Sequence, residues 1–386
     1  MSEISGGKIT RRRLLKTTAA SVPLLAGCMS YSTPNGTSGS GLNGSKNGDV
    51  SYSVTMAPVG KVDFSRVPQK WSTYSPGYAD MGVALDVGDR LNSIGKAGRY
   101  HTGFYDELPG VGIDKSKLTQ MTGKNGIGKE VFYQLDPDIF VIDPEWLIHN
   151  SFFGLRQKDV DEIRKNVAPF IGNTIFRRTD SWHDYRYYTM YEALEKVAEV
   201  FQRKDKYSNI KKFHDSFIDN IRAKLPPKKD APEALLVWAG SDKPKDFTPY
   251  RISDKGTSNK QYHDLNIKDA LTGTDIDALS ESNRGKIDFE NVLDIDPELM
   301  FIRGHESQTE KEFRSTVVQY LKSDPVASDI KAVKNDKVFR GGPIYEGPIQ
   351  NFFLTERVAK QVYPDSYSGK LFDRKKLADI IKSKDD

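Results

Sequence analysis

Aromatic and arginine side chains stand directly after the predicted strands of this sequence. Ligands of open α/β sheets bind beyond the carboxyl ends of the strands, so side chains at these places are candidates for a binding cleft. Aromatic faces and guanidinium groups suit a large, partly apolar and anionic ligand, through stacking, cation–π contacts and charge-assisted hydrogen bonds. The candidate ligand-binding residues are Tyr74, Arg99, Tyr105, Trp146, Arg177, Arg178, Trp182, Trp238, Tyr250, Arg251, Arg303, Arg340 and Tyr345.

Each of these candidates also has a structural explanation. A large aromatic residue after a strand is more often a packing residue, and a single arginine is more often a surface charge. We therefore expect about half of the candidates to line the cleft.

A second set of candidates comes from a motif that the sequence contains twice. Residues 128–143 read GKEVFYQLDPDIFVID, and residues 288–303 read DFENVLDIDPELMFIR. In each copy a glutamate, Glu130 or Glu290, stands seven residues before a proline. Apolar residues at helical spacing, then proline, then a β-branched run predict a helix, a turn and a buried parallel strand. A glutamate at a helix start is stabilising through the helix dipole, and the repetition indicates two similar α/β lobes.

The sequence gives little support to catalytic or metal chemistry. Its only cysteine, Cys28, excludes an intrachain disulfide, a thiolate metal cluster and a cysteine-attached haem. The six histidines are scattered without paired spacing, so we expect no metal site and no cofactor. Neither G-x-G-x-x-G after a strand nor G-x-S-x-G occurs. The net charge of +4 is small and its charges are mixed along the chain, which argues against nucleic-acid binding.

The N-terminal residues have the pattern of an export signal. TRRRLLK at 10–16 precedes an apolar and small-residue run that ends in Leu-Ala-Gly-Cys28. This order is typical of a twin-arginine signal joined to a lipobox, in which Cys28 would be lipidated. Residues 1–28 are therefore predicted as the signal. Residues 29–60, rich in Ser, Gly and Asn, are predicted as a flexible tether, and their N-glycosylation triplets at Asn35 and Asn43 arise readily by chance.

The chain of 386 residues exceeds the usual size of a single core. The expected class is α/β, with two lobes that each hold a central, mostly parallel sheet flanked by helices, joined by one long α-helix. Apolar spacing predicts one helix within 182–201, a polar break at 203–209 and a second helix up to Pro226. A short helix is also predicted at 267–271. The predicted divisions are an N-terminal α/β lobe (61–202), an interlobe helix (203–226), a C-terminal α/β lobe (227–345) and C-terminal helices (346–386).

Taken in order, these features resemble the substrate-binding proteins of ABC importers for iron–siderophores and cobalamin. The resemblance rests on the lipobox, the tether, the repeated unit, PQKWSTYSPGYADMGVALDVGDRL at 68–91 and KAVKNDKVFRGG at 331–342. It runs from about Val62 to Tyr363. It implies a bilobed monomer that is not an enzyme, anchored by lipid to the outer face of the cell membrane. Such a protein captures an iron(III)–siderophore, or a similar large anionic chelate, and delivers it to an ABC permease dimer with its ATPase.

The resemblance also implies a role for the two matched acids. In that family a glutamate at this place on each lobe pairs with arginine of the permease, and the matched spacing carries this role to Glu130 and Glu290. One carboxylate on each lobe would steer and orient docking. Other ligands remain open, namely cobalamin or haem on the same fold. Other classes remain open as well, namely an exported oxidoreductase, or a surface adhesin or sensor subunit.

Overall fold

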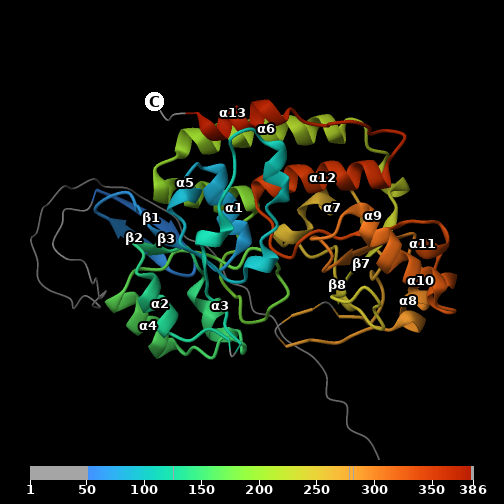
Figure 1. Cartoon of the computed structure of the whole chain (residues 1–386), viewed down its shortest axis with the longest axis horizontal. Coiled ribbons are helices and arrows are strands. Elements are labelled where there is room, and N and C mark those ends of the chain that lie inside the picture. Colours follow the sequence, from blue (N-terminus) through green and yellow to red (C-terminus); the bar gives the residue numbers. More distant parts are fainter. Residues whose placement is uncertain (1–50, 125, 278, 281, 384–386) are drawn as a thin grey trace, which may run out of the picture. The chain divides into compact units, whose positions relative to one another are not determined.

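The computed structural model describes residues 51–383 apart from residues 125, 278 and 281. The predicted signal with Cys28, and most of the predicted tether, lie outside the described residues. Within them helices and strands are interspersed along the chain, which confirms the expected α/β class (Figure 1). The strands are β1 (Tyr52–Met56), β2 (Gly60–Phe64), β3 (Trp71–Ser72), β4 (Ser93–Ile94), β5 (Thr119–Gln120), β6 (Ile139–Phe140), β7 (Glu233–Trp238), β8 (Thr248–Tyr250), β9 (Lys268–Asp269), β10 (Leu299–Arg303) and β11 (Val338–Arg340). The helices are α1 (Pro76–Ala84), α2 (Glu130–Leu135), α3 (Pro144–His149), α4 (Gln157–Asn166), α5 (Met190–Phe201), α6 (Lys204–Arg222), α7 (Lys260–Asp264), α8 (Phe289–Ile295), α9 (Glu310–Phe313), α10 (Gln319–Ser323), α11 (Lys331–Lys334), α12 (Pro348–Val362) and α13 (Arg374–Lys382).

The N-terminal strands are short and pair in parallel. β3 pairs with β6, and β4 pairs with β5. Two single parallel bridges, Trp71 to Leu91 and Phe140 to Phe170, extend this arrangement. Because parallel neighbours run in the same direction, the segments that follow these strands emerge at one edge.

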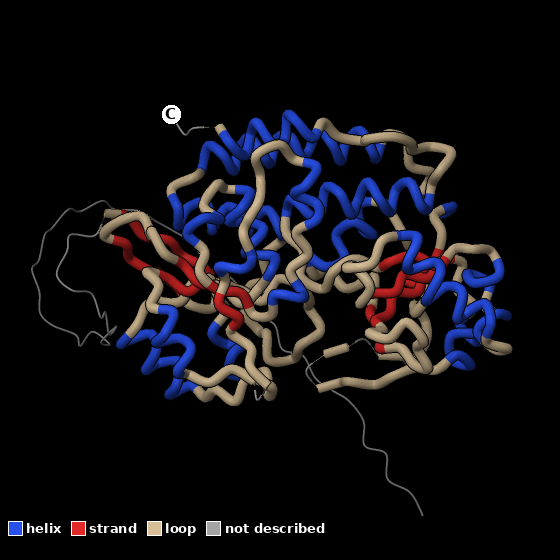
Figure 2. Tube along the Cα trace, viewed as in Figure 1, coloured by secondary structure: helices blue, strands red, loops and turns tan. Residues whose placement is uncertain are grey.

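The C-terminal strands form a larger sheet in the order β11-β10-β7-β8. β10 is parallel to β7 and β11, β9 adds a short parallel pairing to β7, and β8 pairs with β7 antiparallel. All five residues of β10 are buried, as expected for an inner strand of a sheet covered on both faces. Figure 2 shows the strands gathered in two places, with helices around each.

The repeated helix–turn–strand unit that the sequence predicts is confirmed. The C-cap residue of α2 is Asp136, whose φ is 40°, and the chain then leads into β6. The C-cap residue of α8 is Asp296, whose φ is 43°, and the chain then leads into β10. A left-handed residue ends each helix, and the proline that follows in both copies prevents its continuation.

Helices α6, α12 and α13 tie the sheets together. α6 packs against α5 and α13, and α12 contacts both α1 and α7 (Figure 1). The fully buried ring of Phe352 on α12 lies 5.2 Å from Phe217 on α6 and 5.1 Å from Phe372. One hydrophobic core includes Trp71 of β3 and Phe301 of β10. Contacts of this kind join the described residues into one unit.

Several expectations about elements are wrong. Residues 52–60, predicted as the end of the tether, belong to a hairpin of β1 and β2, which the hydroxyl of Tyr52 anchors to the carbonyl of Val200. The expected break at 203–209 is only a two-residue corner, because α6 already begins at Lys204. The helix expected from 182 begins at 190, and the helix expected at 267–271 is replaced by β9.

No helix among the described residues combines the length and the apolar composition that crossing a bilayer requires.

Replacing Phe352 with alanine should lower the free energy of unfolding by about 3–5 kcal/mol, because the cavity left among α6, α12 and the C-terminal segment cannot collapse fully. Denaturant unfolding followed by circular dichroism measures this. The matched control is Phe152→Ala, because the side chain of Phe152 is 51% exposed. This substitution should lower the free energy of unfolding by less than about 1 kcal/mol. Equal losses in the two variants would contradict the role assigned to Phe352.

Candidate functional site

A cavity of about 640 Å³, called here the main cavity, lies among segments near the short N-terminal strands and the larger C-terminal sheet. Its volume falls within the range of pockets that hold a complete small-molecule ligand. Of the sequence candidates, those that line it are Tyr74, Arg99, Trp146, Arg177, Trp238, Tyr250 and Tyr345. Tertiary structure therefore brings these side chains together from segments that are far apart in the sequence.

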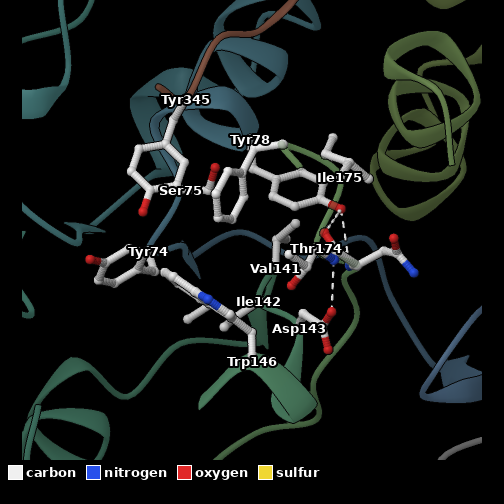
Figure 3. Close-up of a pocket in the computed structure, with 12 residues that line it drawn as sticks. Tyr74, Ser75, Tyr78, Val141, Ile142, Asp143, Trp146, Thr174, Ile175 and Tyr345 are labelled. Carbon is white, nitrogen blue, oxygen red and sulfur yellow. Dashed lines mark hydrogen bonds between the residues drawn. The ribbon is translucent and has the colours of Figure 1, made fainter. Parts of the chain in front are cut away.

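Aromatic rings form one wall of the main cavity. The ring of Trp146 lies 4.6 Å from Tyr74 and 6.4 Å from Tyr345, in edge-on arrangements (Figure 3). Phe176 lies 4.7 Å from Tyr345 and completes the cluster. Burial raises the pKa of the Tyr74 and Tyr345 hydroxyls, so both stay neutral. The indole Nε1 of Trp146 is buried and has no hydrogen-bond partner among the described residues.

Positive charge dominates the rest of the wall, and the described residues that line the cavity include no carboxylate. Arg177 donates two hydrogen bonds to Asp180, at 2.6 and 2.9 Å, and Lys286 pairs with Asp246 at 2.8 Å. The cationic lining residues are Lys96, Arg99, Arg177, Arg284 and Lys286.

Two of these cations lack a protein counter-charge. Within the described part of the chain, the side chains of Lys96 and Arg99 form no ion pair and no hydrogen bond, and both residues are exposed. Uncompensated positive charge beside apolar rings favours an anionic ligand with an apolar surface.

A second cavity of about 210 Å³, called here the side cavity, adjoins the main cavity. Both cavities are lined by Lys96, Arg99, Trp238, Ile344 and Tyr345. The remaining lining residues of the side cavity include His101, Glu306 and Ser307.

Four candidate arginines line neither cavity, and three of them donate to backbone carbonyls. Arg303 is fully buried and donates to two backbone carbonyls and to Asn259. Arg251 donates to three backbone carbonyls of the 271–276 segment, and Arg340 donates to one carbonyl and lies 3.6 Å from a carboxylate of Glu310. These guanidinium groups satisfy loop carbonyls, which explains why they lie below the surface of the cavities.

The other candidates outside the cavities lie in aromatic or hydrogen-bonded clusters. Tyr105 is buried and donates to Asp80 at 2.6 Å. The guanidinium of Arg178 lies over a tyrosine ring, 4.9 Å from its centroid. Trp182 stacks on His149 at 5.2 Å. None of the three lines the main cavity, although Trp182 packs against the aromatic cluster that forms its wall.

Some lining residues are not among the sequence candidates, which are mainly the first side chains after each strand. Lys96, Phe152 and Lys286 all line the main cavity. Lys96 lies in a long segment rich in glycine and charge, and such segments are often functional, so this signal could have found it. No sequence signal distinguishes Phe152, whose exposure arises only from the tertiary structure.

The two matched glutamates are both exposed. Glu130 is the first residue of α2 and Glu290 is the second residue of α8. Neither side chain forms an ion pair with any residue that the structure describes. Both carboxylates thus lie at helix starts, where the dipole favours them, and remain available to a partner.

A buried carboxyl group lies behind the aromatic wall. Asp143 lines a small cavity of about 20 Å³ that shares Tyr74 and Trp146 with the main cavity (Figure 3). Its oxygens accept hydrogen bonds from the Tyr185 hydroxyl and the Thr174 amide, both at 2.7 Å. Burial raises the pKa of Asp143 to about 6, and these hydrogen bonds limit the rise.

Among the described residues, no group of three or more His, Cys, Asp or Glu side chains has the arrangement of a metal site.

Comparisons with known proteins add an independent observation. The model of the family described as periplasmic binding protein matches residues 72–345. The Fe(3+)-citrate-binding protein YfmC of Bacillus subtilis is 23% identical over 316 residues, which cover 82% of this chain and 84% of that protein.

Solved structures share the fold. The iron uptake ABC transporter substrate-binding protein PiuA of Streptococcus pneumoniae has a TM-score of 0.56 and 17% identity, over 82% of this chain and 100% of that chain. The triscatecholate siderophore-binding protein FeuA of Bacillus subtilis, complexed with ferri-bacillibactin, has a TM-score of 0.54 and 15% identity, over 80% and 98% of the two chains.

Tyr185→Phe removes one donor to Asp143 and should destabilise the protein in a pH-dependent way. Because the pKa of Asp143 when folded, about 6, lies above its ordinary value of 3.8, stability falls as pH rises through this window. Losing the hydroxyl raises that pKa further, so the fall extends to higher pH. At a pH well above this pKa, the variant should lose about 1–3 kcal/mol of unfolding free energy. At a pH well below it, the loss should be smaller.

The control for this variant is Tyr187→Phe, whose hydroxyl has no hydrogen-bond partner in the part of the chain that the structure describes. Chemical denaturation on both sides of the pKa measures both variants. A Tyr185→Phe loss that is independent of pH would contradict the assignment.

Proposed function

The chain belongs to the periplasmic binding protein family, and on that premise we propose that it captures an iron(III)–siderophore outside the cytoplasmic membrane for an ABC importer. The observation that carries the proposal is the main cavity. Its rings and its uncompensated Lys96 and Arg99 complement a large, anionic and partly apolar chelate. The relative that binds Fe(3+)-citrate and the siderophore-binding protein of similar fold support the same ligand class.

The chelate body would lie against the aromatic wall. Trp146 can pack its ring on the ligand, and Tyr74 and Tyr345 offer neutral hydroxyls. Arg177 is held in place by its two hydrogen bonds to Asp180, so its orientation is fixed before a ligand arrives. Fixed groups bind with a smaller loss of conformational entropy.

The proposal divides the body of the chain into two lobes, residues 61–202 and 227–345, with the cavity between them and the helix at 203–226 as their connection. Support comes from the lining, which draws on both strand sets, and from α6, whose 19 residues lie within the described body. A helix of this length spans about 30 Å, enough to act as a brace.

The proposal also includes membrane attachment and docking. Cys28 would carry the lipid anchor after removal of the twin-arginine signal, and residues beyond it would act as the tether. Glu130 and Glu290 would pair with arginines of the permease. Their exposure, and the absence of any counter-charge among the described residues, support this role.

Ligand binding can be tested by tryptophan fluorescence, because Trp146 and Trp238 line the main cavity. A ferric siderophore should quench the emission in a saturable manner, and Trp146→Phe should reduce the amplitude of quenching. Native mass spectrometry of protein purified from its own host should reveal a co-purified ligand. The proposal is overturned if the protein shows saturable binding to none of the ferric citrate, hydroxamate and catecholate chelates.

Reversing both docking charges, Glu130→Arg with Glu290→Arg, should abolish uptake and leave ligand affinity unchanged, because neither residue lines the main cavity or the side cavity. Uptake of radioactive iron by cells and fluorescence titration of the purified variant measure the two properties. The loss of the helix-dipole interaction should cost only about 0.3–1 kcal/mol of stability at each position.

The matched control is Glu195→Arg with Glu233→Arg, which reverses two other exposed glutamates. Normal uptake by the Glu130 and Glu290 double variant, or equal loss in the control, would remove the docking assignment.

A further inference from the structure

The side cavity lies at the carboxyl ends of the parallel strands β7, β10 and β11. Trp238 ends β7, Glu306 and Ser307 follow β10, and Gly342 follows β11. Its volume of about 210 Å³ is below the size of pockets that hold a complete ligand. Since it shares part of its wall with the main cavity, it has room for one part of a ligand whose body lies there.

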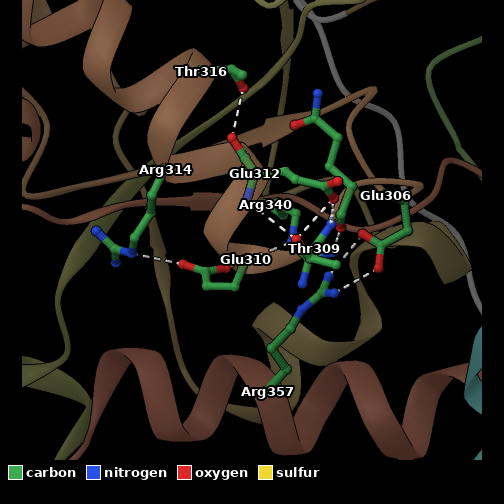
Figure 4. Close-up of polar contacts among 9 residues, drawn as sticks. Glu306, Thr309, Glu310, Glu312, Arg314, Thr316, Arg340 and Arg357 are labelled. Atoms are coloured by element: carbon green, nitrogen blue, oxygen red, sulfur yellow. Dashed lines mark hydrogen bonds and ion pairs between the residues drawn. The ribbon is translucent and has the colours of Figure 1, made fainter.

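The charge of the side cavity is set by a buried ion pair. Glu306 is its only carboxylate among the described lining residues. Arg357, which comes from α12, donates to both oxygens of Glu306 at 2.6 and 3.0 Å (Figure 4). The two side chains are only 4% and 17% exposed. A bidentate pair of this kind neutralises the carboxylate from behind, so Lys96 and Arg99 leave the side cavity positively charged.

Neutral donors complete the lining. Burial lowers the pKa of His101, so its imidazole is uncharged at neutral pH and offers one N–H. Ser307 is exposed, and its hydroxyl forms no hydrogen bond with any residue that the structure describes. The side cavity therefore presents two cations and small polar groups beside the apolar residues Trp238, Pro343, Ile344 and Tyr345.

We propose that the side cavity is a separate subsite for a carboxylate arm of the chelate whose body occupies the main cavity. This inference rests on the proposed function, and it names a ligand class, ferric chelates that carry a carboxylate not bound to iron. Lys96 and Arg99 stand at the boundary of both cavities and bind that carboxylate. If iron coordinates every anionic oxygen of a chelate, the side chains of Lys96 and Arg99 have no free carboxylate to bind, and the affinity for that chelate is lower.

Ser307→Phe tests the subsite, because Ser307 lines the side cavity and not the main cavity. The larger side chain should fill the subsite. The matched control is Ser65→Phe, at an exposed serine that lines neither cavity. A second variant, Lys96→Met with Arg99→Met, removes the charges and keeps the chain lengths similar. Thermal unfolding midpoints equal to that of the unmodified protein verify that each variant folds.

The probes are ferric citrate, which has carboxylates that are not bound to iron, and ferrichrome, a tris-hydroxamate chelate without a carboxylate. The unmodified protein should bind ferric citrate more tightly than ferrichrome. Ser307→Phe and the double variant should each weaken ferric citrate binding about tenfold, as expected for loss of a charge-assisted hydrogen bond. Ser307→Phe and Ser65→Phe should leave ferrichrome binding unchanged.

The outcomes separate the inference from the proposed function. Unchanged ferric citrate affinity in Ser307→Phe, or a preference of the unmodified protein for ferrichrome, overturns the subsite while the siderophore-binding function stands. If the folded, unmodified protein binds neither these probes nor a ferric tris-catecholate, the proposed function fails and the subsite fails with it.

Discussion

Parallel strand pairing is the constraint on which the rest of this structure depends. Parallel neighbours end at the same edge, so the segments after β3, β6, β7, β10 and β11 gather wherever those edges face a common space. Both cavities are lined largely by such segments. The core that includes Trp71 and Phe301, and the packing of α12 on α1 and α7, hold these edges in place. Ligand contacts can then come from loops while the supporting elements remain rigid.

Burial decides what each arginine does. Arg303 and Arg340 lie where loop carbonyls need donors, and their guanidinium groups serve the fold. Arg357 is buried against Glu306 and removes a charge from the side cavity. Arg99, which is exposed at the end of a short 3-10 helix, retains its charge for a ligand. The same residue type therefore supports the loops, balances an acid or faces the ligand space, depending on the local supply of oxygen atoms.

The repeated unit was predictable because its signals are local. Apolar spacing before Pro137 and Pro297 and the β-branched runs after them are sufficient for a helix, a turn and a strand. The corner at Gln202 was placed less accurately, because α6 begins with charged residues whose helical state depends on later apolar positions packing against α5 and α13. The hairpin at 52–64 was missed in part because its first strand directly follows the polar segment, although Pro58 and Gly60 between the two strands are a turn signal.

By itself the sequence determined the α/β class, the duplicated unit, the exposed places of Glu130 and Glu290, and an aromatic and cationic character near strand ends. These features are local, because apolar periodicity and helix-ending residues such as proline act between neighbours in the chain. Only the tertiary structure decided which candidates meet in one cavity. It placed Tyr74, Trp146 and Tyr345 together and turned Arg303 inward. The reason is physical: the direction and burial of a side chain beyond a strand depend on loop paths and on partners hundreds of residues away, which no local pattern encodes.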